Sequence, residues 1–112
     1  MTVVMMLTYR GEGDNARRFA HDMVSKGVVE RIRSEDGNER YDYLFPMDDD
    51  SSVVLIDAWR DQKALDDHHH SRMMKEIMEL RERYGLTVTA QRLESVESDH
   101  KDDIWLSVGK KE

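Results

Sequence analysis

The run His68-His69-His70 holds the side chains in this sequence that are best suited to acid–base chemistry. An imidazole changes its protonation state near neutral pH, so a histidine can remove a proton from a phenol or an enol. Successive helical residues are separated by about 100 degrees, so three adjacent histidines cannot converge on one metal ion. The run therefore predicts no metal site of its own and leaves a single histidine as a candidate base.

His68 is the member of the run that we expect to face the interior. It follows Leu65 by three positions and Ala64 by four, which places all three on one side of a helix. His70 is then expected to face solvent, with His69 between the two. Two roles stay open for His68: a general base, or a structural histidine that hydrogen-bonds a neighbour and fixes a helix corner.

A second group of candidates lies on predicted strands. Alternation puts Trp59 on the same strand face as Leu55 and Asp57, and we assign this face to a cavity between helices and sheet. Trp59 would wall a pocket for a flat aromatic ligand, and Asp57 would orient the candidate base or contact substrate. Tyr41 and Tyr43 share one face of another strand and could line the same cavity. Ordinary core packing explains the aromatic residues as well, and Asp57 could instead pair with an arginine.

Hydrophobic periodicity predicts the elements that must position these residues. We expect one long helix across Gly27, because the apolar stripe continues beyond it. The order β-α-β-β-α-β is typical of an α+β, ferredoxin-like fold with a four-stranded antiparallel sheet. The predicted strands are 3–10, 41–45, 53–60 and 86–93, and the predicted helices are 15–33, 62–70 and 72–84.

The helices of such a fold cover one face of the sheet only. On the third predicted strand, Val54, Ile56 and Ala58 point away from Leu55 and Trp59 and are all apolar. An apolar sheet face needs a cover in water, and a second copy of the chain is the natural one. The pattern therefore predicts a homodimer.

Length and composition limit the classes of function. The 112 residues suffice for one domain, 1–94, followed by a polar tail, 95–112, whose apolar triplet 104–106 is expected to dock on the sheet edge or on a partner. The net charge of −7 argues against nucleic-acid binding, which needs clustered basic residues.

Two features that the sequence lacks, a long apolar segment and cysteine, indicate where we expect the protein to act and which sites it cannot have. The apolar run 3–7 is too short for a secretory or membrane helix, so we expect a cytoplasmic protein without membrane contact. The chain also has no cysteine, which excludes disulfides and thiolate zinc sites.

The stretch 53–93 resembles the C-terminal half of the antibiotic biosynthesis monooxygenase family, and the likeness extends more loosely over 2–94. The resemblance implies a ferredoxin-like domain that dimerises into an α+β barrel. It is carried by Trp59-Arg60-Asp61-Gln62, by Ala64-Leu65 and by the step His68-x-x-Ser71.

The resemblance also implies a reaction. The well-understood members oxidise hydroxylated aromatic compounds without flavin or metal, because the deprotonated substrate passes an electron directly to O2. By analogy, His68 would be the base and Trp59, Tyr41 and Tyr43 would wall the pocket for a small phenolic or quinol-type substrate. This sequence departs from those members at Leu55, where they carry an asparagine that donates a hydrogen bond.

Two other functions remain open. The chain could be a non-catalytic, dimeric module that holds a small apolar ligand or is associated with stress. It could also resemble the haem-degrading branch of the fold, which carries a tryptophan at the position of His68 and its haem-ligating histidine at that of Met78. That branch also has an asparagine on its first strand that has no clear counterpart here, so the departures argue against haem.

Overall fold

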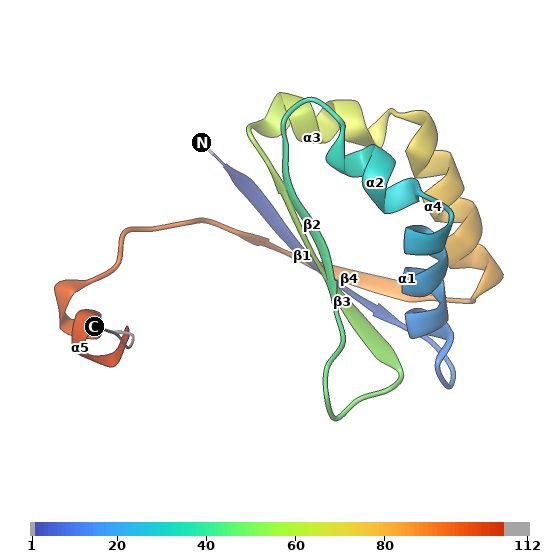
Figure 1. Cartoon of the computed structure of the whole chain (residues 1–112), viewed down its shortest axis with the longest axis horizontal. Coiled ribbons are helices and arrows are strands. Elements are labelled where there is room, and N and C mark those ends of the chain that lie inside the picture. The colour runs from blue at the N-terminus through green and yellow to red at the C-terminus, as the bar shows by residue number, and fades with distance from the viewer. Residues whose placement is uncertain (1, 107–112) are drawn as a thin grey trace.

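The computed structural model of the chain describes residues 2–106. Its strands and helices follow the predicted order, with a short helical segment added in the tail (Figure 1). The elements are β1 (Val3–Arg10), α1 (Asn15–Ser25), α2 (Val28–Arg33), β2 (Asn38–Leu44), β3 (Ser52–Trp59), α3 (Gln62–His69), α4 (Arg72–Arg83), β4 (Thr87–Leu93), a 3-10 turn (His100–Asp102) and α5 (Asp103–Leu106).

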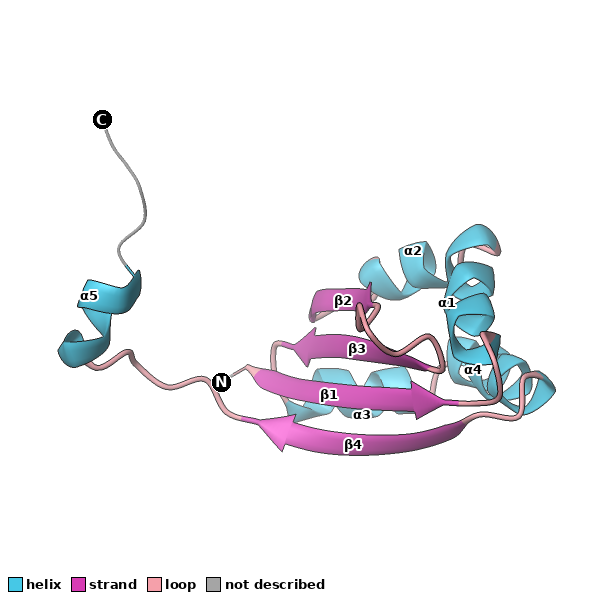
Figure 2. Cartoon of the chain, turned by 90° about the horizontal axis from the view of Figure 1, so that it is seen from below, coloured by secondary structure: helices cyan, strands magenta, loops and turns pink. Residues whose placement is uncertain are grey.

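The four strands form one antiparallel sheet in the order β2-β3-β1-β4. The helices α1 to α4 gather on one side of this sheet, as Figure 2 shows. The register pairs Val3 with Trp59 and Leu7 with Leu55, so these side chains share the helix-covered face. The predicted α+β, ferredoxin-like class is confirmed.

The prediction of one continuous helix across Gly27 is wrong. Gly27 has a φ of 75°, a left-handed conformation that glycine adopts without a steric penalty, and the helix breaks there into α1 and α2. Val28 and Ile32 are nonetheless buried, so the apolar stripe continues on a second helix axis. The second strand also begins earlier than predicted, at Asn38 rather than Tyr41.

The core lies between the helices and the covered face of the sheet. Its largest fully buried side chains are Trp59, Tyr41, Phe19, Met23 and Ile32. None of the helices described between residues 2 and 106 forms a layer over the opposite face of the sheet, which we call the open face. Its centre is built from Val4, Met6, Thr8, Val54, Ile56 and Ala58, paired across β1 and β3.

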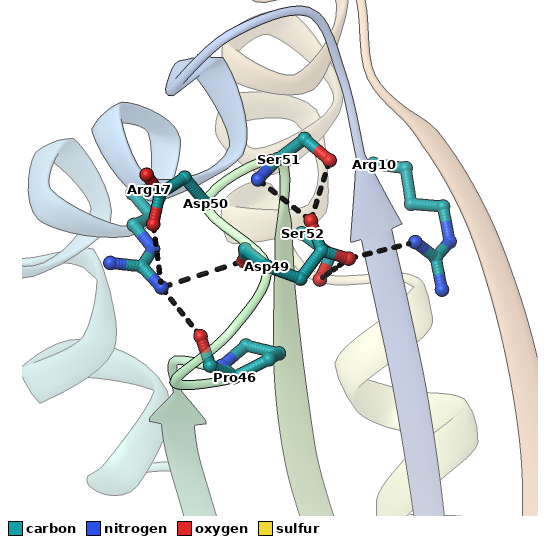
Figure 3. A network of polar contacts seen from close by, with 7 residues as sticks. All are labelled: Arg10, Arg17, Pro46, Asp49, Asp50, Ser51 and Ser52. Carbon is teal, nitrogen blue, oxygen red and sulfur yellow. Dashed lines mark hydrogen bonds and ion pairs between the residues drawn. The ribbon is translucent and has the colours of Figure 1, made fainter.

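The acidic connection between β2 and β3 is a loop, as predicted, and Asp49 organises it (Figure 3). Its carboxylate accepts hydrogen bonds from the backbone N–H of Ser51 at 3.0 Å and from the hydroxyl of Ser52 at 2.9 Å. Bonds from Ser51, Ser52 and Arg10 lower the pKa of Asp49 to about 2. These contacts fix the entry into β3, the strand that carries the candidate site residues.

The tail leaves the sheet after β4, and α5 lies apart from the rest of the chain (Figure 1). Ile104, Trp105 and Leu106 are 72%, 79% and 58% exposed, so the apolar triplet does not pack on its own sheet. Docking on a partner stays a prediction. None of the helices between residues 2 and 106 has the length and apolar composition that a bilayer crossing requires.

Candidate functional site

The helix α3 delivers His68 to the interior. Its N-cap residue Asp61 accepts a hydrogen bond from the backbone N–H of Ala64 at 2.9 Å, which fixes the start of the helix after β3. His68 then lies on the same side as Ala64 and is only 3% exposed, whereas His69 and His70 are exposed. The structure therefore places the three histidines as the helical spacing predicts.

Glu35 is the polar partner of His68. The carboxylate Oε2 lies 2.9 Å from Nδ1 of the imidazole. An ionised carboxylate can only accept hydrogen bonds, so Nδ1 must carry the proton. In a neutral imidazole the lone pair then lies on Nε2, which becomes the nitrogen able to accept a proton. The indole of Trp59 stacks on the imidazole with ring centroids 4.6 Å apart and fixes its plane.

The turn that carries Glu35 is fastened to the start of α3. The backbone N–H of Arg60 donates to the carbonyl of Gly37 at 2.7 Å, and the Arg60 guanidinium pairs with both Asp36 oxygens at 3.2 Å. Gly37 has a φ of 87°, and a Cβ there would lie 2.5 Å from the Cβ of Ala64. Only glycine lets the turn approach α3 this closely, and that approach brings Glu35 to His68.

Asp57 is the second buried carboxyl group of the site, with 5% of its surface exposed. Desolvation raises its pKa to about 6, although the indole N–H of Trp59, which it accepts as a hydrogen bond, and the nearby His68 both act to lower it. Glu35, which the sequence reasoning missed, makes the bond to the imidazole that was considered for Asp57. Asp57 holds the indole instead.

A small cavity of about 50 Å³ lies between the helices and the covered face. The residues around it come from β1, β2, β3, α3 and α4, which meet only in the folded chain. They are Leu7, Tyr9, Tyr41, Leu55, Asp57, His68, His69, Met74 and Ile77.

Four of the predicted site residues, Tyr41, Leu55, Asp57 and His68, thus meet at one cavity. Trp59 is fully buried behind His68 and is not part of the lining. Tyr43 neighbours Tyr41, but it lines a separate surface groove of about 680 Å³ between β2 and the helices α1 and α2.

The cavity groups differ in their capacity to exchange protons. Burial raises the pKa of Tyr9 to about 12 and that of Tyr41 well above its ordinary value, so both phenols keep their protons at neutral pH. His68, His69 and Asp57 remain as the lining groups whose chemistry suits proton transfer, and of these His68 and Asp57 are buried whereas His69 is exposed. Within residues 2–106, no three His, Cys, Asp or Glu side chains are grouped so as to hold a metal ion.

The site residues that the sequence did not reveal as such are Glu35 and five residues of the cavity lining: Leu7, Tyr9, His69, Met74 and Ile77. Glu35 stands 33 positions before its partner, in a polar turn that looks like ordinary surface. The available signal was Asp36-Gly37-Asn38, which predicts a turn but not what the turn touches.

The comparison with protein families assigns the chain to a family. The family model described as antibiotic biosynthesis monooxygenase matches residues 2–80. The chain belongs to this family. The match covers β1 to most of α4, and so includes Glu35, Asp57, Trp59 and His68.

Solved structures agree with the family in fold. SnoaB from Streptomyces nogalater, described as a cofactor-independent oxygenase, is 15% identical with a TM-score of 0.72 over 87% of this chain and 95% of that chain. PA3566 from Pseudomonas aeruginosa is 20% identical with a TM-score of 0.72 over 86% and 95%. Rv0793 from Mycobacterium tuberculosis is 23% identical with a TM-score of 0.63 over 88% and 98%. No curated protein matches the chain.

Proposed function

We propose that this chain is a cofactor-independent monooxygenase for a small hydroxylated aromatic or quinol-type substrate, with His68 as the general base. The observation that carries the proposal is the contact between Glu35 and Nδ1 of His68 at 2.9 Å, at the edge of the cavity. This contact leaves Nε2 as a proton acceptor. Membership of the monooxygenase family supplies the class of reaction.

The chemistry balances without an external reductant. His68 removes a hydroxyl proton, and the electron-rich anion then reduces O2 and combines with it. One oxygen atom becomes a new carbonyl or hydroxyl of the product and the other leaves as water, so that hydroquinone and O2 give hydroxybenzoquinone and water. The substrate supplies all four electrons, and the residues supply proton transfer and exclusion of water.

The cavity is too small for an aromatic substrate, so side chains at its edge must move to admit one. Its volume of about 50 Å³ accommodates water or O2. Pockets for small organic ligands typically measure about 300–1,000 Å³. His69 is exposed and Met74 is half-buried, so these two side chains form the solvent side of the cavity. We propose that they swing outward to admit the aromatic ring, a motion that an unbranched methionine makes easily.

The test is oxygen consumption with a panel of hydroquinones, in air and under anaerobic conditions, without added flavin or metal. We expect wild-type protein to consume one O2 per product formed. His68→Ala should lower kcat by about 10²- to 10⁴-fold, the usual contribution of a general base. His70→Ala, a matched change at the exposed histidine that follows the same helix, should leave kcat unaltered. Consumption no greater than that of His68→Ala argues against the proposal.

The second candidate function is a non-catalytic module that binds a small apolar ligand, and the small, mostly apolar cavity favours it. In this reading, His68 only joins α3 to the turn at Glu35. Binding of a hydroquinone under air without oxygen uptake, with equal affinity for wild type and His68→Ala, distinguishes this function from the first.

We also propose that a second copy of the chain covers the open face. The half-buried Val4, Met6, Val54 and Ile56 form an apolar surface that water would otherwise contact. The exposed triplet 104–106 would dock on the same partner. Light scattering should give twice the chain mass for the intact protein, and removal of residues 95–112 should weaken the assembly.

A further inference from the structure

We infer that Glu35 is a positioning residue: its carboxylate holds the Nδ1–H of His68 so that Nε2 is presented to the cavity as the proton acceptor. The inference rests on the proposed function, in which His68 removes the substrate proton. It assigns a role in proton transfer to a residue outside α3, in the turn that follows α2.

The contact has the geometry of a charge-assisted hydrogen bond. Nδ1 of His68 lies 2.9 Å from Oε2 and 3.3 Å from Oε1 of Glu35. The side chains of His68 and Glu35 are 3% and 17% exposed, so water competes little for the bond. A carboxylate in this position selects one of the two neutral tautomers, the one with its proton on Nδ1.

Of the two carboxylates near His68, Glu35 is the one that holds the Nδ1–H of the imidazole. Trp59 stacks on one side of the imidazole and Tyr41 presents a ring edge at 6.2 Å between centroids, so the ring plane is fixed. The other nearby carboxylate, Asp57, accepts the indole N–H of Trp59. The two carboxylates thus act on different rings of one stack: Glu35 on the imidazole and Asp57 on the indole.

Glu35 is also built into the frame of the site. Its turn is bonded to the start of α3 through Arg60, and Gly37 lies against Ala64. A glutamate in a mobile loop would lose backbone entropy on binding His68, whereas Glu35 lies in a turn whose backbone is already held against α3. The fold therefore pre-organises the pair before substrate arrives.

The tautomer can be observed directly by 1H–15N NMR of protein labelled in its histidine rings. We expect wild-type His68 to carry its proton on Nδ1. Glu35→Leu should shift it toward the Nε2–H form and lower kcat by about tenfold or more, with KM little changed. Glu35→Gln keeps an oxygen that can accept the bond, so it should retain most of the Nδ1–H form and lose less activity.

The control is Glu76→Leu. Glu76 is a surface glutamate that pairs with Arg31 at 2.8 Å, away from the cavity, and its loss should change neither tautomer nor kcat. A wild-type spectrum with the proton on Nε2 overturns the inference without any variant. An unchanged tautomer in folded Glu35→Leu also overturns it, even if oxygenation is normal. Absence of oxygen uptake in wild type overturns only the proposed reaction, because the spectra still decide what Glu35 does.

Discussion

The two faces of the sheet are made from alternate residues of the same strands, yet they differ in chemical character. On β3, Asp57 points under the helices while its neighbours Ile56 and Ala58 point to the open face. On β1, Tyr9 is buried on the covered side, whereas Thr8 lies on the open side. At the centre of the sheet, the strand period of two thus places Asp57 and Tyr9 under the helices and small or aliphatic groups on the open face, whereas the ionisable Arg40 and Asp42 of the edge strand β2 also lie on the open face.

This difference indicates which face is suited to proton transfer and which is suited to assembly. Burial under the helices shifts the proton affinity of a carboxyl group, as the pKa of about 6 at Asp57 shows. The centre of the open face has no ionisable side chain among Val4, Met6, Thr8, Val54, Ile56 and Ala58, so it is suited to packing. We therefore propose that proton transfer takes place at the covered face and that assembly takes place at the open face.

The largest expected effect tests whether the covered face of the sheet is the core that stabilises the fold. Trp59→Ala should lower the free energy of unfolding by about 3–5 kcal/mol, because it removes a fully buried indole and its stack with His68. Trp105→Ala, the matched change at the 79% exposed indole of the tail, should alter it by less than about 0.5 kcal/mol. Urea unfolding at low protein concentration measures both. Similar losses in the two variants contradict the assignment of the core.

Asp57 gives the covered face a pH dependence of definite sign. Its pKa is about 6 in the folded chain against 3.8 for the free group, so folding disfavours its ionised form. Between about pH 4 and 6 the unfolded chain has lost this proton and the folded chain keeps it, so stability falls as pH rises. The whole shift corresponds to about 3 kcal/mol, reached above about pH 6. Asp57→Asn should remove this decline.

The measurement is the difference in unfolding free energy between wild type and Asp57→Asn from pH 4 to 7. We expect the variant to gain relative to wild type as pH rises. Asp49→Asn is the control: the pKa of Asp49 is lowered to about 2, so its contribution is lost only as pH falls through that value. A wild-type-minus-variant difference for Asp57 that stays flat over this range contradicts the account.

The sorting of residues between the faces was predictable from sequence, because it depends only on alternation along a strand. The inward position of His68 was predictable for a similar reason, since helical spacing relates it to Leu65 and Ala64. Both are local patterns with a fixed period. They need no knowledge of how distant segments meet.

What alternation could not supply were the contacts between segments far apart in the chain. Glu35 reaches His68 because Gly37 lets a turn approach α3, and no period in the sequence relates these positions. The break at Gly27 was missed because apolar spacing continued through it, while the backbone preference of one glycine decided the outcome. The position of Trp59 behind His68, rather than in the lining, also depends on three-dimensional packing.

The turn that joins Glu35 to the covered face can be disturbed separately. Gly37→Ala should cost about 1–2 kcal/mol for the left-handed φ of 87°, and about 1–3 kcal/mol more because the new Cβ would lie 2.5 Å from that of Ala64. Gly27→Ala is the control, because Gly27 has a φ of 75° but nothing within 4 Å of its Cβ position. Thermal unfolding compares the two. Equal losses would mean that the close approach to α3 does not hold the turn.

A substitution on the open face should affect assembly rather than folding. We expect a small change in the stability of the single chain and a clear change in the association of two copies. Ile56 is only half-buried, so Ile56→Lys should lower the unfolding free energy of dilute protein by less than about 1 kcal/mol. In a two-fold dimer each copy contributes one lysine to the apolar contact, and the dissociation constant should rise about 100-fold or more. Val24→Lys on the solvent side of α1, where Val24 is 61% exposed, should leave the mass unchanged. If Ile56→Lys keeps the wild-type mass at every concentration, the open face is not where two copies meet, and the division of tasks between the two faces fails on that side.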